Sequence, residues 1–117
     1  MKGIYFINEK WQMNDYTTIN ESTDIQKESI LSYLEANHIE SMKLNPYQMN
    51  DYYTIPHALF YDLKQIKPQL DCLVLYSAKA IDTFIASYPA RWLVLKSFFN
   101  EVIFVDEAQT EQWQDIS

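Results

Sequence analysis

Four short apolar segments alternate with amphipathic stretches along this chain, and that alternation restricts its fold more than any other feature. The segments are predicted strands, at residues 2–7, 39–44, 71–76 and 101–106. The stretches between them carry apolar side chains at helical spacing. This order is typical of a parallel sheet with helices on both faces. Right-handed crossovers favour the strand order 2-1-3-4, as in flavodoxin-like folds, so we expect one three-layer α/β domain over residues 1–117.

The first predicted helix has two candidate starts. Ser22 or Thr23 can act as its N-cap, and a capping box of Thr18 with Glu21 would start it earlier. Its apolar face carries Ile30, Leu31 and Leu34. We expect this helix to end near Asn37 and His38.

Prolines mark the later helices. Pro68 closes the second helix, whose apolar face consists of Ile55, Leu59, Leu63 and Ile66. Pro89 interrupts the third, which predicts two short helices or one kinked helix. Its two apolar stripes are Ile81, Phe84, Ile85 and Tyr88, then Trp92, Leu95, Phe98 and Phe99. The acidic tail is predicted to be a last helical turn docked through Trp113, or a frayed end.

One nonapeptide occurs twice, as WQMNDYTTI at residues 11–19 and YQMNDYYTI at residues 47–55, with seven of nine positions identical. Each copy follows one of two neighbouring predicted strands. We therefore expect both loops to rise side by side at the carboxyl edge of the sheet, where open α/β folds bind ligands. Asx-turns at the Asn-Asp pairs and caps at the Thr-Ile pairs explain part of the repeat.

Turn and cap chemistry does not require the shared Gln-Met pairs or the flanking aromatic residues. Aromatics, methionine and amides together are typical of interfaces. The alternative, a local duplication of turn chemistry, stays open. The predicted partner-binding residues are Trp11, Gln12, Met13, Asn14, Asp15, Tyr16, Tyr47, Gln48, Met49, Asn50, Asp51 and Tyr52.

Composition argues against several classes of ligand. A net charge of −7, with Arg91 as the single arginine, makes direct nucleic-acid binding a poor hypothesis. Gly3 is the only glycine, so phosphate-cradling loops for ATP, GTP or NAD cannot form, and we predict no cofactor. The single Cys72 cannot form an internal disulfide, and no apolar stretch suits a signal peptide or a membrane span. We expect a soluble, cytoplasmic protein.

A second set of residues at the same predicted edge forms an alternative active site: Glu9, Ser77, Lys79 and Asp106. A lysine near a serine can serve as its base, and acids at this edge could hold Mg²⁺. Surface turns and solvated strand ends explain the same residues. His38 and His57 lack further ligands at metal spacing, so no metal site is predicted. Cys72 is predicted to fill the core.

Three stretches, IQKESILSYLEANHIE, LDCLVLYSAKAIDTF and LKSFFNEVIFVDE, resemble the N-terminal catalytic domain of serine recombinases, the resolvase and invertase family. The family carries Y-x-R-V-S at its first strand and D-R-L-S-R after its third. Here the first motif reads YFINE, so Ile7 replaces the arginine and Glu9 replaces the nucleophilic serine. The second reads KAIDT, at residues 79–83. Ile55 stands where the family often has another arginine.

A serine recombinase attacks a DNA phosphate with serine and stabilises the charge with guanidinium groups. The resemblance therefore implies a catalytically inactive resolvase-like domain without a DNA-binding extension. We expect a non-enzymatic, protein-binding or regulatory module that acts through the carboxyl edge. Two alternatives stay open: a remodelled metal-dependent phosphoester enzyme, and an acidic regulator of a DNA-binding protein. The sequence also leaves a homodimer open.

Overall fold

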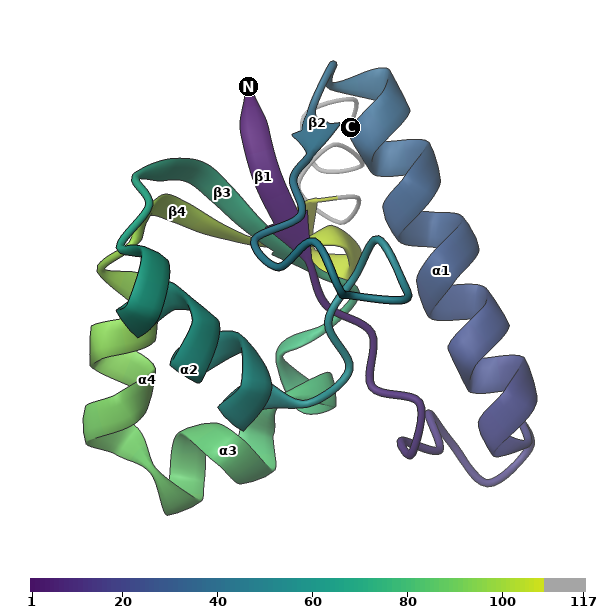
Figure 1. Cartoon of the computed structure of the whole chain (residues 1–117). Helices are drawn as coiled ribbons and strands as arrows, with labels where there is room; N and C mark the ends of the chain where they lie inside the picture. Colours follow the sequence, from purple (N-terminus) through teal and green to yellow (C-terminus); the bar gives the residue numbers. More distant parts are fainter. Residues whose placement is uncertain (109–117) are drawn as a thin grey trace.

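Figure 1 shows the computed structural model of the chain, which describes residues 1–108. In this part of the chain, one four-stranded parallel sheet has the order β2-β1-β3-β4. The strands are β1 (Lys2–Tyr5), β2 (Glu40–Ser41), β3 (Leu70–Leu75) and β4 (Phe99–Phe104). The predicted α/β class and strand order are confirmed. The predicted last turn with Trp113 lies outside the described residues.

The helices cover both faces of this sheet (Figure 1). On one face lies α1 (Ile19–Ala36); the opposite face carries α2 (Pro56–Ile66), α3 (Asp82–Ser87) and α4 (Pro89–Lys96). In this order, β2 lies on one side of β1, whereas β3 and β4 lie on the other side. The connection from β1 to β2 therefore crosses the sheet in one direction, and the connections from β2 to β3 and from β3 to β4 cross it in the opposite direction. Right-handed crossovers therefore place the helices of the two directions on opposite faces.

The central strand β3 is buried on both of its faces. Leu73 and Leu75 belong to the core beneath α2 and α4, whereas Cys72 and Val74 face α1. Successive side chains of a strand point to opposite faces, so a stretch covered on both sides is apolar at successive positions. This explains the run of four apolar residues over 72–75, which follows the half-buried Asp71.

The start of α1 differs from one of the two predictions. Thr18, not Ser22 or Thr23, is the N-cap: the Glu21 backbone N–H donates to Thr18 Oγ1 at 3.0 Å and Glu21 Oε1 accepts from the Thr18 backbone N–H at 3.3 Å. The buried face of the helix consists of Ser22, Gln26, Ile30 and Leu34. Leu31, predicted on this face, is 42% exposed. The first two buried residues, Ser22 and Gln26, are polar, so the pattern of apolar residues does not mark where the helix begins.

Two other predictions need correction. The strand predicted at 39–44 is only two residues long, and Met42 and Leu44 beyond it pack against the core beneath α2. Phe99, predicted on a helix, is the first residue of β4. The break at Pro89 produces two short helices, as one of the two alternatives predicted. Within residues 1–108, no helix has the length and apolar character needed to cross a membrane.

Candidate functional site

Both copies of the nonapeptide follow the carboxyl end of the sheet. Beyond β1, the backbone of Phe6 and Ile7 continues in the strand direction and pairs with Tyr53 of the second copy. The Ile7 N–H donates to the Tyr53 carbonyl at 2.9 Å, and the Tyr53 N–H donates to the Tyr5 carbonyl at 3.1 Å. The first copy begins shortly afterwards, at Trp11. The second copy is therefore anchored beside the segment that leads into the first.

Tyr52 makes the further contacts at this junction. Its hydroxyl donates to Glu9 Oε2 at 3.3 Å, and its ring lies 5.5 Å from the ring of Tyr5. Lys27 Nζ, from α1, lies 5.6 Å from the centre of the same ring. Burial, followed by the charge of Glu9, raises the pKa of Tyr52. The predicted site residue Tyr52 thus joins the second copy to the base of the first and to α1.

The glutamine is the residue that acts alike in both copies. Gln12 Nε2 donates to the Thr17 carbonyl at 2.9 Å, and Gln48 Nε2 donates to the Tyr52 carbonyl at 3.4 Å. Each amide therefore ties its own loop together. Both glutamines are predicted interface residues, and these hydrogen bonds give them a local structural role as well.

The Asx-turns of the two copies do not correspond. Asn14 Oδ1 accepts from the Tyr16 N–H at 2.8 Å, as predicted. In the second copy the turn is made by Asn45, which precedes the repeat and accepts from the Tyr47 N–H at 2.9 Å. The two loops therefore share a sequence without sharing one local conformation.

Equivalent large side chains have opposite exposure in the two copies. Trp11 is half-buried, with its ring 6.4 Å from that of Tyr76, whereas its counterpart Tyr47 is 90% exposed. Met13 and Tyr52 are likewise half-buried. Their counterparts are Met49, which is 96% exposed, and Tyr16, which is 95% exposed.

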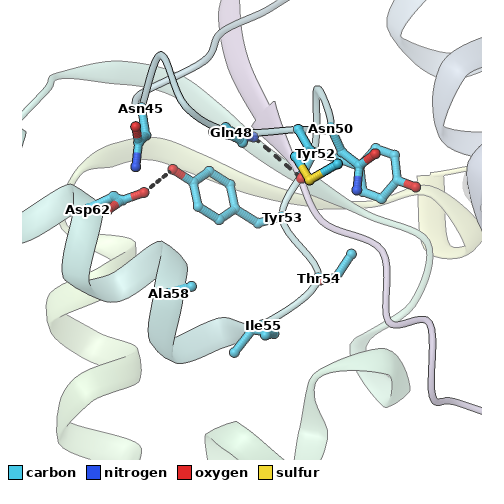
Figure 2. Close-up of a pocket in the computed structure, with 10 residues that line it drawn as sticks. Asn45, Gln48, Asn50, Tyr52, Tyr53, Thr54, Ile55, Ala58 and Asp62 are labelled. Carbon is cyan, nitrogen blue, oxygen red and sulfur yellow. Dashed lines mark hydrogen bonds between the residues drawn. The ribbon is translucent and has the colours of Figure 1, made fainter.

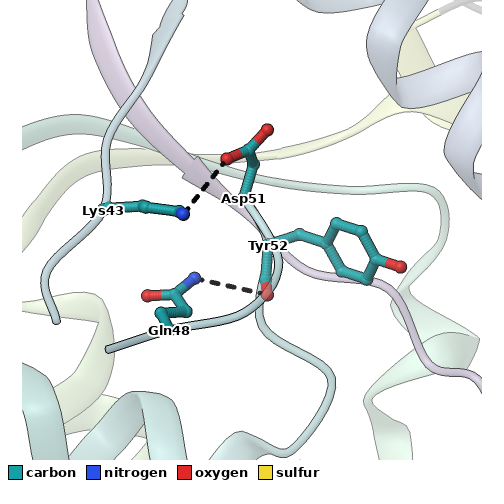
Figure 3. Close-up of polar contacts among 4 residues, drawn as sticks. All are labelled: Lys43, Gln48, Asp51 and Tyr52. Carbon is teal, nitrogen blue, oxygen red and sulfur yellow. Dashed lines mark hydrogen bonds and ion pairs between the residues drawn. The ribbon is translucent and has the colours of Figure 1, made fainter. Parts of the chain in front are cut away.

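The acids of the two copies point into solvent. Asp15 is exposed, and Asp51 lies 3.7 Å from Lys43 Nζ in an ion pair at the surface, as Figure 3 shows. An exposed pair of this kind contributes little stability. Both aspartates are therefore accessible to a partner.

The residues of the alternative active site serve local structure. Ser77 is buried, and its Oγ accepts from the Lys79 backbone N–H at 3.2 Å, which caps the short 3-10 turn η1 (Ala78–Ala80). Asp106 Oδ1 accepts from the Glu107 N–H at 2.7 Å, and the Asp106 N–H donates to the Tyr76 carbonyl at 2.9 Å. Asp106 therefore stands beside the segment that carries Ser77, while Glu9 accepts from Tyr52.

The structure also bears on metal and thiol chemistry. Across residues 1–108, no group of three or more His, Cys, Asp or Glu side chains is arranged to hold a metal ion. Cys72 is fully buried, and burial raises the pKa of its thiol to about 11 from an ordinary value of 9.0. The predicted core role of Cys72 is confirmed.

A cavity beneath the second copy was not foreseen. It has a volume of about 250 Å³ and lies between the loop that precedes α2 and α2 itself (Figure 2). The Tyr53 hydroxyl donates to Asp62 Oδ2 at 2.6 Å in its wall. The sequence did contain one sign that residue 53 has a special role. It is one of the two positions at which the copies differ, and its counterpart is Thr17. The structure explains the difference, because Tyr53 is buried in the core whereas Thr17 lies in a loop.

The bond between Tyr53 and Asp62 predicts a pH dependence of stability. Burial, then the hydrogen bond to Asp62, raises the pKa of Tyr53 above its ordinary value of 10.0. The stability that this protonated hydroxyl contributes is complete below pH 10.0 and is lost as the pH rises further towards the pKa of the folded state. Replacing Tyr53 by phenylalanine should cost about 1 kcal/mol at neutral pH and flatten the alkaline loss. Urea unfolding over a series of alkaline buffers measures both, and parallel curves for the two proteins would contradict the assignment.

A second unforeseen feature lies on another face of α2. The guanidinium of Arg91 lies 5.0 Å from the ring of Tyr88 and 5.9 Å from that of Phe60, and its Nη1 lies 3.2 Å from His57 Nδ1. Because a guanidinium only donates, Arg91 is the donor in this contact and the imidazole nitrogen is the acceptor. The single arginine is therefore held by aromatic rings in a groove between α2 and α4. His57 is exposed.

Comparisons with models of known protein families, with curated proteins and with solved structures gave no match. The relation to serine recombinases therefore remains a proposal drawn from the residues quoted above.

Proposed function

We propose that this chain is a non-enzymatic, resolvase-like domain that binds another protein through the exposed side chains of its two nonapeptides. The observation that carries the proposal is the exposure of Tyr16, Tyr47 and Met49, at 95%, 90% and 96%. Large aromatic and apolar side chains held in water are typical of interfaces. Tyrosine offers a large contact area at a small entropic cost, and methionine adapts to irregular surfaces.

The positions that correspond to recombinase catalytic groups support a role without catalysis. Ile7, at the position of the family's arginine, is fully buried in the core on the α1 side. Glu9, at the position of the nucleophilic serine, accepts a hydrogen bond from Tyr52. An apolar core residue cannot stabilise developing phosphate charge, and a hydrogen-bonded carboxylate is a poor nucleophile for a phosphodiester.

The charge of the chain favours a partner with a basic surface. A net charge of −7 attracts such a surface over a distance and accelerates its encounter with the domain. The DNA-binding face of a regulatory protein is one surface of this kind. We expect added salt to slow association with the partner, as measured by surface plasmon resonance, and a rate that is indifferent to salt would contradict this choice of partner.

The proposal is tested by replacing Tyr16, Tyr47 and Met49 together with alanine. Trp11 and Tyr52 are left in place, because their rings pack against Tyr76 and Tyr5 and their loss would disturb the fold. The unfolding free energy should change by about 0.5 kcal/mol or less, since exposed side chains contribute little to stability. Affinity purification from lysate of the source organism, followed by mass spectrometry, should lose the partner that the wild-type protein recovers.

A matched control replaces three exposed large residues on α2 and α4 with alanine, namely Tyr61, Ile66 and Leu93. This variant removes three large exposed side chains outside the repeats, although it removes less exposed surface, and it should recover the partner at the wild-type level. Recovery of every wild-type partner by the variant of Tyr16, Tyr47 and Met49 would refute the proposal.

A further inference from the structure

We propose that the cavity beneath the second nonapeptide receives a basic side chain, lysine or arginine, of the protein partner. This inference rests on the proposed function, and it assigns a chemical class to one contact of that interface.

The cavity is small, open to solvent and lined by groups that accept hydrogen bonds. Its volume is about 250 Å³, and α2 forms one wall while the loop of the second copy forms the other (Figure 2). The polar side chains in this lining include Asn45, Gln48, Asn50, Tyr53 and Asp62. This is a space for the end of one side chain rather than for a large cofactor.

Gln48 leaves a buried acceptor without a donor. Its Nε2 donates to the Tyr52 carbonyl at 3.4 Å, as the dashed line in Figure 3 shows. Because a carbonyl only accepts, the amide nitrogen must face Tyr52 and the oxygen must turn the other way. Oε1 of Gln48 is buried, and within residues 1–108 it has no hydrogen-bond partner. A buried acceptor in this state is destabilising, and a bound donor would satisfy it.

Asp62 places a negative charge in the same cavity. The Tyr53 hydroxyl donates to its Oδ2 at 2.6 Å, which fixes the orientation of the carboxylate. Burial of Tyr53 raises the pKa of its hydroxyl, so the tyrosine remains the donor in this bond. Among the described residues the ion pair present joins Lys43 to Asp51, so Asp62 has no basic partner inside the domain.

These groups together select a cation that carries N–H donors. An ammonium or guanidinium group can donate to an amide oxygen such as Gln48 Oε1, and it can neutralise a carboxylate such as that of Asp62. An anion would be repelled by Asp62, and an apolar group would leave Gln48 unsatisfied. A water molecule could donate to Gln48 but would leave the charge of Asp62 without a counterion.

The test uses two blocked amino acids as probes, N-acetyl-lysine methylamide and N-acetyl-arginine methylamide, titrated into ¹⁵N-labelled full-length protein at constant ionic strength. We expect saturable shifts of the Gln48 side-chain amide and of the Tyr53 and Asp62 backbone amides. The lysine probe acetylated on its side-chain nitrogen, which is neutral, should cause none. In the Asp62→Asn variant, which keeps an acceptor for Tyr53, binding should weaken by about tenfold or more.

Two further variants make the result decisive. Asp24→Asn removes one negative charge from the exposed face of α1 and should bind the probes as the wild type does. If Asp62→Asn does not fold, Gln48→Met removes the unpaired acceptor while keeping the charge, and it should also weaken binding. The inference is wrong if the wild type shows no saturable shift, or if the neutral probe and the charged probes act alike.

The partner experiment separates this inference from the proposed function. Loss of the partner by Asp62→Asn, together with probe binding by the wild type, supports the assignment to a partner's side chain. Recovery of the partner by Asp62→Asn at the wild-type level overturns that assignment and leaves a site for free amines. Failure of the proposed function has a different signature, because the variant of Tyr16, Tyr47 and Met49 would then retain every partner.

Discussion

Replacing Gly3 by alanine is expected to lower the free energy of unfolding by about 2–3 kcal/mol, as for overpacking in a close-packed core. Gly3 is paired in register with Cys72 of the central strand β3. A Cβ at this position would lie 2.8 Å from Cys72 Sγ, 2.9 Å from the Cys72 carbonyl oxygen and 3.1 Å from Cγ2 of Ile39. The carbonyl is part of the β3 backbone, so the two strands would have to move apart. Denaturant unfolding followed by circular dichroism measures the loss.

A double-mutant cycle identifies the cause of this loss. Adding Cys72→Ala to Gly3→Ala removes the contact with the sulfur but leaves the contact with the carbonyl oxygen. We therefore expect part of the stability, and not all of it, to return relative to Cys72→Ala alone. Ser41→Ala, on the other strand paired with Gly3, is the matched control and should change stability by about 0.5 kcal/mol or less. An equally small effect of Gly3→Ala would contradict the prediction.

The sequence predicted the central strand well because burial on both faces leaves one signature, a run of successive apolar residues such as 72–75. It also predicted the strand order, because right-handed crossovers leave few arrangements of alternating strands and helices. It did not predict the role of Gly3. The scarcity of glycine argued against phosphate-binding loops. The role of Gly3 is different, because it depends on which residue of β3 lies opposite Gly3, and the sequence of one strand does not reveal that pairing.

The first helix was harder to predict than the central strand. Its start was ambiguous because two of its buried positions, Ser22 and Gln26, are polar and do not contribute to an apolar stripe. The exposures of the two nonapeptides were also beyond prediction. Whether an aromatic residue of the repeat is buried depends on a neighbour from elsewhere in the chain, such as Tyr76 for Trp11. The cavity of the second copy likewise needs Asp62, which α2 supplies from outside the repeat.

Gln26 makes the bond that supports the start of the first loop. It is fully buried on α1, and its side-chain amide pairs with the backbone of Asn8 in the manner of a neighbouring strand. The Asn8 N–H donates to Gln26 Oε1 at 3.0 Å, and Gln26 Nε2 donates to the Asn8 carbonyl at 2.9 Å. The backbone of Ile7, the preceding residue, is hydrogen-bonded to Tyr53. The pairing with Gln26 fixes the chain three residues before the first nonapeptide begins at Trp11.

Replacing Gln26 by leucine should lower the free energy of unfolding by about 3 kcal/mol, because two partly buried backbone groups of Asn8 lose their partners. Hydrogen exchange of the Asn8 amide should accelerate more than that of the Tyr53 amide, since the pairing of Tyr53 with β1 remains. Partner binding should also weaken, because the first loop would be held less firmly. Glu28→Leu, an exposed change on the same helix, is the matched control. If Gln26→Leu and Glu28→Leu unfold alike and the Asn8 amide keeps its protection, then Gln26 does not hold the loop.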